Sequence, residues 1–384
     1  MKNFKNSRKA VILIAMLLLV GMIATGCGKL DPISVTEDVP EGTLDTLTGE
    51  YYEELPARPV MVSTDNVGEA IPQYGISLAD IVYEVPVEGS QSRLEAIYYS
   101  ELPEVAGPTR SVRPYIVDLA REYDAILTHD GWSPQARKYL SEGKVADIPA
   151  QKYSCFHRIS EKPAPHNEQA DMDKVMKIAE EQGYLDEEVQ IPQFGFFTEG
   201  ELAVATGTED EYTAKYEEKA KSLLEKPNQE YTIPSLEGIT VDLGNECKTI
   251  EVGYANCKSK YTWDAEKGLY TRDVNGSKYK DLNNDKQIKM ANVIVYKVSS
   301  KSYDYKGRLE IDMTKGGDAW VFTLGHVKKC KWSKEDLDSP TKFLDEEGNE
   351  IKLTPGKTWI NIIDQASSFD FDEVKAPEKD ETED

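Results

Sequence analysis

Segments with the patterns of strands and helices alternate through the first half of the chain. Short runs at 58–63, 81–87 and 93–100 carry the alternating apolar residues of strands. Helical patterns begin at Pro114 and Pro134, where proline suits the first helical position. This alternation is typical of layered α/β architectures, so we predict an α/β domain at 51–206.

The pattern changes after Ile239, where only short β-type runs follow. Turn signals such as Val274-Asn275-Gly276 separate these runs. We therefore predict a β-rich domain at 236–366, and an α+β class for the whole chain. Between the two blocks, 207–235 is highly charged and reads as a linker or an insertion. The segment 367–384 is dominated by acids and predicts a disordered tail.

The N-terminus has the order of a bacterial lipoprotein signal peptide. A basic start is followed by an unbroken apolar run, small residues and then Cys27. The apolar run is short for a membrane span of about 20 residues, which disfavours an uncleaved anchor. We predict removal of 1–26, a lipid on Cys27 and a flexible tether at 27–50. The protein would then be held at the cell membrane and face the extracytoplasmic side.

Charge excludes one class of partner. The formal net charge is -24, and removal of the signal peptide leaves 41 basic against 69 acidic residues. A surface this acidic repels polyanions, so we expect no nucleic-acid partner. The membrane contact would depend on the lipid at Cys27.

Cysteine spacing and known motifs indicate neither a metal nor a cofactor. An exported chain permits disulfides, and Cys247 and Cys257 are close enough in sequence to bridge a hairpin. Buried free thiols remain an equal alternative for these two residues and for Cys155 and Cys330. The chain has no P-loop, no GxGxxG after a strand, no GxSxG and no HExxH, so no cofactor is predicted.

Two arginines stand out in the segment Gly107-Pro-Thr-Arg-Ser-Val-Arg-Pro114. Arg110 and Arg113 precede a predicted helix whose free backbone N–H groups favour anions. Guanidinium forks at this position predict a site for a carboxylate, phosphate or sulfate. The alternative is that both arginines form salt bridges within the domain.

Histidines provide the second signal. His129 ends a predicted strand, and His166-Asn167 lies in a proline-rich loop. Strand ends and loops of α/β layers are common places for ligands. The alternative is that each histidine holds a turn by hydrogen bonds. We take His166 and Asn167 as candidate ligand contacts and His129 as a candidate catalytic partner.

Three acids complete the candidate set. Asp65 follows a strand, Glu84 lies inside one and Glu88 lies at its end. Two of them would form an acid/base pair if they converge. A buried Glu84–Arg113 or Glu88–Arg110 ion pair is the structural alternative.

Several motifs resemble the YerB-like bacterial lipoproteins, whose two domains have unknown function. The matching stretches are ARPVMVSTDN (57–66), ADIVYEVPVEG (79–89), GPTRSVRPYIVDLAREYDAILTHDG (107–131), APHN (164–167), YTRDVNG (270–276), ANVIV (291–295) and LTPGKTWINII (353–363). The resemblance covers most of 54–365 and implies a lipid-anchored, envelope-facing protein with two domains. It implies no reaction, and the charged stretch 207–230 is not part of the pattern.

Three functional hypotheses remain open at this stage. The first is a binding module that holds an anionic cell-envelope ligand through Arg110, Arg113 and His166. The second is a hydrolase or transferase acting on an envelope glycan or phosphopolymer through carboxylate and histidine chemistry. The third is a scaffold in which these polar residues only brace the fold.

Overall fold

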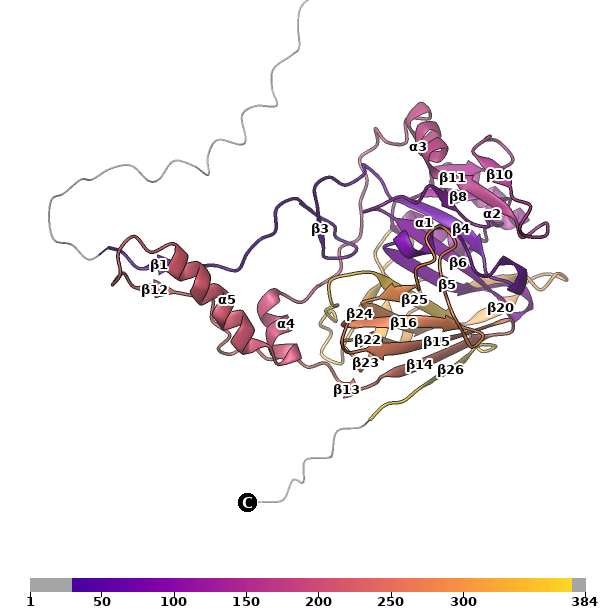
Figure 1. Ribbon diagram of the computed structural model, residues 1–384. Helices are drawn as coiled ribbons and strands as arrows, with labels where there is room; N and C mark the ends of the chain where they lie inside the picture. The colour runs from indigo at the N-terminus through magenta and orange to yellow at the C-terminus, as the bar shows by residue number, and fades with distance from the viewer. Residues whose placement is uncertain (1–29, 375–384) are drawn as a thin grey trace, which may run out of the picture. The chain divides into compact units, whose positions relative to one another are not determined.

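The computed structural model describes residues 30–374 (Figure 1). These residues form two compact units. The smaller combines 30–37 with 210–235, and the larger combines 38–209 with 236–374. The predicted signal peptide and Cys27 lie outside the described residues.

The larger unit is built on an eleven-stranded sheet. Ten strands follow one another across it in the order β13 (Asn245–Glu246), β23 (His326–Ser333), β22 (Gly317–Thr323), β19 (Asn292–Lys297), β25 (Thr358–Ile363), β5 (Ile81–Pro86), β6 (Ser92–Tyr98), β4 (Val60–Asp65), β8 (Ile126–His129) and β9 (Asp147–Pro149), and β24 (Lys342–Leu344) pairs with β23.

Smaller sheets accompany it. A six-stranded sheet contains β17 (Ser277–Lys278), β16 (Leu269–Val274), β15 (Cys257–Asp264), β14 (Thr249–Tyr254), β26 (Ser368–Phe371) and β18 (Lys289–Met290). A three-stranded sheet contains β10 (Phe156–Arg158), β11 (Glu168–Asp171) and β7 (Val105–Ala106), and two hairpins pair β2 (Thr43–Leu44) with β3 (Tyr51–Tyr52) and β20 (Ser300–Ser302) with β21 (Leu309–Ile311).

The helices of the larger unit lie in its first half. They are α1 (Pro114–Glu122), α2 (Pro134–Leu140), α3 (Met172–Glu181) and α4 (Glu199–Thr206), with short 3-10 helices at Gly68–Ala70, Ile76–Leu78 and Glu88–Ser90. Both predicted proline starts are confirmed, and the Ser133 hydroxyl accepts a hydrogen bond from the Ala136 N–H at 3.2 Å. From Asn245 to Phe371 every element is a strand. The predicted α+β class with a β-rich second half is confirmed.

Two hydrophobic cores cover the two faces of the large sheet. One face, with Met61 and Leu127, packs against Ile116 and Leu119 of α1. The other face, with Val60 and Leu94, belongs to the cluster that includes the six-stranded sheet and α3. Figure 1 shows β14, β15, β16 and β26 as a layer of their own. The alternating strand pattern thus buries both faces of the large sheet.

The two sequence blocks share the large sheet. β25 from the end of the chain pairs in parallel with β5 from the first block, with Thr358 opposite Ile81 and Asn361 opposite Glu84. The strand order could not be predicted from the apolar pattern of each strand. That pattern fits a strand of the eleven-stranded sheet and a strand of the six-stranded sheet equally well.

The segments that we predicted as a tether, as a linker or insertion and as a tail contain regular secondary structure. Within the predicted tether, β1 (Ile33–Ser34) pairs with β12 (Tyr231–Thr232), and Leu47 is fully buried. Within the predicted linker, α5 spans Glu209–Ser222. Within the predicted tail, β26 pairs with β14, because Phe369 and Phe371 provide an alternating apolar face that offsets the neighbouring acids. The part of that tail after residue 374 lies outside the described residues.

All four cysteines of the described residues, at positions 155, 247, 257 and 330, are free thiols. Cys247 and Cys257, the pair that spacing made compatible with a hairpin bridge, are both buried.

Candidate functional site

The arginine-bearing loop lies between the end of β4 and the start of β11. Its backbone is held on both sides: the Arg110 N–H donates to the Ser63 carbonyl at 2.8 Å, and the Thr109 N–H donates to the Glu168 carbonyl at 2.6 Å. Gly107 has φ +144°, and a Cβ there would lie 2.6 Å from the Gln169 Oε1. Only glycine fits this close approach, which fixes the loop beside β11.

Asp65, at the end of β4, contacts an arginine and a histidine side chain through a single oxygen. Its Oδ2 lies 2.7 Å from the Arg110 Nε and 2.7 Å from the His166 Nδ1. Asp65 itself is nearly buried, whereas the side chains of Arg110 and His166 keep 24 % and 18 % of their surface exposed. We call these three residues the Asp65 cluster.

The outward atoms of the Asp65 cluster remain available. Among the described residues, the Arg110 Nη1 and Nη2 and the His166 Nε2 have no recorded hydrogen-bond partner. Asp65 contacts the Nε of Arg110 and the Nδ1 of His166. These contacts orient the guanidinium and the imidazole, and leave the outer nitrogen atoms of both groups without a partner in the part of the chain that the structure describes. Lys162 adds positive charge: its Nζ donates to the Ala70 carbonyl at 2.9 Å. Burial lowers the pKa of Lys162, and the Asp65 carboxylate partly opposes that shift.

Asn167 supports the histidine loop instead of the open side of the cluster. Its side chain donates to the Ile159 carbonyl at 2.8 Å and accepts from Arg158 at 2.9 Å. The backbone N–H of His166 donates to the Pro163 carbonyl at 2.8 Å. These bonds close the loop and place His166 against Asp65, so Asn167 acts on the cluster by positioning its neighbour.

Arg113 lies on the helix start as expected, but its donors are already occupied. Its Nε donates to the Glu88 Oε2 at 3.0 Å, its Nη2 pairs with the Glu88 Oε1, and its Nη1 donates to the carbonyls of Ser111 and Val112. Burial alone raises the pKa of Glu88, but the hydrogen bond and charge of Arg113 outweigh it and leave that pKa lowered. The structure therefore differs from the expected anion fork, because a nearer carboxylate fills the fork.

Glu84 is taken out of solvent entirely. Its Oε2 lies 2.8 Å from the Arg272 Nη2, and neither side chain has exposed surface. Its Oε1 accepts from Asn66 at 2.9 Å and from Ser92 at 2.8 Å. The ion pairs are thus the buried Glu84–Arg272 and the half-buried Glu88–Arg113, which replace the Glu84–Arg113 and Glu88–Arg110 pairs considered from the sequence. Asp65, Glu84 and Glu88 each bind a different arginine and form no acid/base pair.

His129 lies apart from the open side of the Asp65 cluster. It is fully buried, with Nδ1 2.8 Å from the Gly131 carbonyl oxygen and its ring edge-on to Trp132. Its Nε2 is 3.5 Å from the Asp147 Oδ2, which is an ion-pair distance but not an aligned hydrogen bond. This environment matches the turn-holding alternative for His129.

Five charged residues near the Arg110 loop were not singled out from the sequence. Asp130 and Glu168 both pair with Arg158, at 3.6 and 3.1 Å. Burial, together with hydrogen bonding to Asp130, raises the pKa of Glu168 to about 7. On the α1 side, burial raises the pKa of Glu95 to about 8 although Arg93 and Arg113 oppose the shift. Single positions inside β strands carry no sequence signal that separates such residues from exposed ones.

No metal or membrane-spanning element is found in the described part of the chain. Between residues 30 and 374, no group of three or more His, Cys, Asp or Glu is placed to hold a metal ion. In the same range no helix has the length and apolar character needed to cross a bilayer.

Comparison with known proteins identifies the family. Two family models match: the N-terminal domain of the "Protein of unknown function (DUF3048)" at 47–185 and the C-terminal domain of the same family at 250–360. The fold and the two matches define a two-domain protein of the DUF3048 class. The chain belongs to the YerB-like family.

Two comparisons with YerB of Bacillus subtilis, one of sequence and one of structure, support this assignment. The chain is 29 % identical over 353 residues to a Bacillus subtilis protein named "Putative lipoprotein YerB". This alignment covers 91 % of this chain and 94 % of the relative. The crystal structure of the YerB protein from Bacillus subtilis matches with a TM-score of 0.68 and 28 % identity, over 85 % of this chain and 99 % of that chain. The chain is therefore a member of a family that includes a protein named as a lipoprotein.

Proposed function

We propose that this protein is a lipid-anchored, extracytoplasmic binding protein that holds an anionic cell-envelope ligand at the Asp65 cluster. The observation that carries the proposal is the shared Asp65 Oδ2, 2.7 Å from both the Arg110 Nε and the His166 Nδ1. One buried carboxylate orients two donors whose outer atoms stay open to solvent.

Electrostatics favours an anion at this position. The protein carries a formal net charge of -24, so an anion is repelled at long range and needs concentrated local positive charge. Arg110 and Lys162 exceed the single charge of Asp65, and protonated His166 would add a further positive charge. The planar Arg110 fork suits a carboxylate or a phosphate, and a charge-assisted hydrogen bond contributes about 1.5–3 kcal/mol.

The anchor part of the proposal rests on the N-terminal sequence and on the name of the Bacillus subtilis relative. Cys27 directly follows Ala24-Thr25-Gly26 at the end of the apolar run. Lipid on its sulfur would tether the protein to the outer side of the cell membrane.

Calorimetric titration of the full chain with inorganic phosphate and with a muropeptide tests the binding proposal. Arg110→Lys keeps the charge but loses the fork, and should weaken binding at least tenfold with an unchanged unfolding midpoint. His166→Gln should weaken it as well. Wild-type protein that binds neither probe would refute the proposal and favour the scaffold hypothesis.

An enzyme remains the second candidate, because an aspartate that orients a histidine is a common general-base arrangement. Here Asp65 would fix the His166 tautomer and Nε2 would move the proton. Glu84, Glu88 and His129 would have no direct part. Incubation with envelope glycans followed by mass spectrometry tests this candidate: it requires a product in wild type that disappears in His166→Gln.

A further inference from the structure

The smaller unit joins the segment after the anchor cysteine to an insertion far along the chain. β1 lies parallel to β12, and the Ile33 N–H donates to the Glu230 carbonyl at 3.0 Å. The Val35 N–H donates to the Thr232 carbonyl at 3.0 Å, and the Gln229 side chain donates to the Asp31 carbonyl at 3.1 Å. Contacts at both ends of 30–37 therefore hold this segment against the insertion.

The insertion has its own small core. Tyr212, Tyr216 and Ala220 are spaced four residues apart on α5, so they share one helix face, and all three are buried. Val35 is also buried, with 6 % of its surface exposed. The Tyr212 hydroxyl donates to the Glu37 Oε1 at 2.7 Å, which adds a polar contact between the two segments.

The family models leave this insertion out, since they match 47–185 and 250–360. Its contacts with 30–37 give it a separate role, close in sequence to Cys27. Asp31 follows Cys27 by four residues, which span at most about 14 Å when fully extended.

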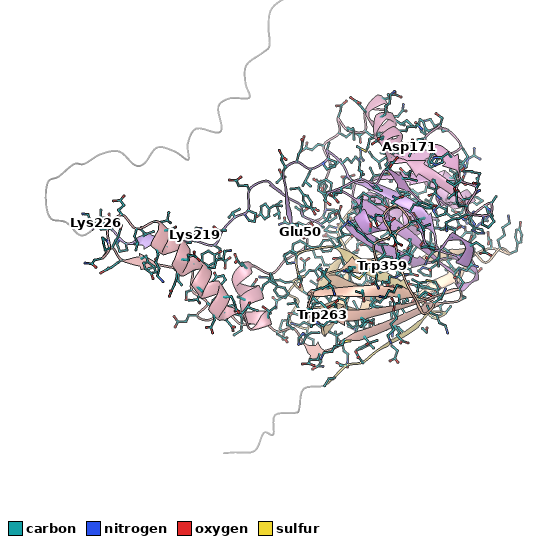
Figure 2. All side chains as sticks on the ribbon, in the orientation of Figure 1. Glu50, Asp171, Lys219, Lys226, Trp263 and Trp359 are labelled. Atoms are coloured by element: carbon teal, nitrogen blue, oxygen red, sulfur yellow. The ribbon has the colours of Figure 1, made fainter. Side chains whose placement is uncertain are left out.

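We propose that 210–235 binds 30–37, the segment next to the lipid anchor, and that the anchor holds 210–235 at the membrane surface. We call 210–235 the clasp. Its partner is the N-terminal segment 30–37 on one side and the lipid surface on the other. The clasp converts what would be a loose tether into an ordered, membrane-proximal module. Figure 2 labels Lys219 on α5 and Lys226 on the loop after it, the two positions that locate the module. The membrane part of this inference rests on the proposed lipidation of Cys27.

Hydrogen exchange tests the grip without depending on the lipid. In the full chain, a peptide covering 30–37 should exchange at least tenfold more slowly than an unstructured segment, and Cys27→Ser should keep that protection. Val35→Asp places a charge at a buried position and should abolish it. Val39→Asp is the matched control, because Val39 is 77 % exposed. Unprotected exchange of 30–37 in wild type would overturn the clasp.

Quenching in vesicles tests the membrane position. A fluorophore is attached through Leu223→Cys, a site with 51 % exposure beside the end of α5, in a Cys330→Ala background. Lipidated protein in vesicles with nitroxide-labelled headgroups should be quenched at least twofold, and Val35→Asp should reduce the quenching. Protein that floats with the vesicles but is not quenched would overturn the membrane-proximal part. Protein that does not float would instead refute the lipid anchor, and the exchange result would still decide the clasp.

Discussion

Arg272 of β16 and Glu84 of β5 form an ion pair from which solvent is excluded, with 2.8 Å between the Nη2 and Oε2 atoms. The guanidinium also lies over Trp359, 4.2 Å from the ring centroid, and over Tyr279 at 4.5 Å. Figure 2 labels Trp359 on the ribbon of the larger unit. The pair links the six-stranded sheet to the eleven-stranded sheet, so one contact couples the two sequence blocks.

Removing one member of this pair should be costly. Arg272→Met leaves the Glu84 carboxylate buried without its counter-charge, and we expect a loss of about 3–5 kcal/mol in the free energy of unfolding. Adding Glu84→Gln should recover part of the loss, because it removes the uncompensated charge. Urea unfolding of the two variants measures both effects. A cost below about 1 kcal/mol for Arg272→Met alone would show that the pair contributes little.

Glu95 predicts a specific dependence of stability on pH. Burial raises its pKa to about 8 from an ordinary value of 4.5, and its Oε2 has no hydrogen-bond partner in the described structure. The folded state therefore keeps a proton that the unfolded state has lost between these two values. Folding stability should fall as pH rises through this window, by at most about 1.4 kcal/mol per pH unit from this group.

Glu95→Gln tests that dependence. The amide cannot ionise, so the variant should gain stability relative to wild type as pH rises from 5 to 8 and keep that gain above pH 8. Urea midpoints at pH 5, 6.5 and 8 provide the measurement, with Glu53→Gln, at an exposed residue, as the control. A difference between variant and wild type that does not change with pH would contradict the assignment.

Arg113→Lys tests whether Arg113 stabilises the fold through Glu88 or contacts a ligand. Lysine cannot reproduce the fork on Glu88, so unfolding should become easier by about 1–2 kcal/mol at neutral pH. Because the pKa of Glu88 is lowered in the folded state, this pair stabilises the fold above the ordinary pKa of a glutamate and is lost as pH falls through the folded value. The difference between Arg113→Lys and wild type should therefore shrink in acid. An unchanged unfolding midpoint together with weakened phosphate binding would contradict the structural role and show that Arg113 contacts the ligand.

Lipidation at Cys27 is tested in a host that has the lipoprotein pathway. Wild-type protein should enter the detergent phase on phase separation, with a processed and modified N-terminus. Cys27→Ser should give a soluble or unprocessed form. Equal membrane retention of an unmodified, uncleaved chain would contradict the anchor.

Local elements were more predictable from the sequence than long-range pairings. Pro114, Pro134 and the alternating runs of β4, β5 and β6 carry their signals within a few residues, and the structure has those elements. The partner of Glu84 could not be predicted, because Arg272 is 188 residues away in the sequence. Arg272 also lies on a strand with an ordinary alternation of burial, which does not set it apart from its neighbours. The strand at 368–371 was missed because acids surround its two phenylalanines.

The candidate site shows the same limit. Asp65, Arg110 and His166 were chosen because they lie at strand ends and loops, and the structure brings these three together. Arg113 and Glu88 met similar criteria but bind each other instead. Sequence position predicts which residues reach a common region, whereas side-chain pairing decides which donors remain open.

The binding claim is tested most directly by following the His166 ring in solution. The Cε1–H resonance of His166 is assigned by comparison with His166→Gln and monitored while phosphate is added to the full chain. Our proposal predicts a saturable shift of this resonance in wild type and a much smaller shift in Arg110→Lys, while the resonance of buried His129 stays constant. No shift at His166, or an equal shift in Arg110→Lys, would contradict an anion site at the Asp65 cluster.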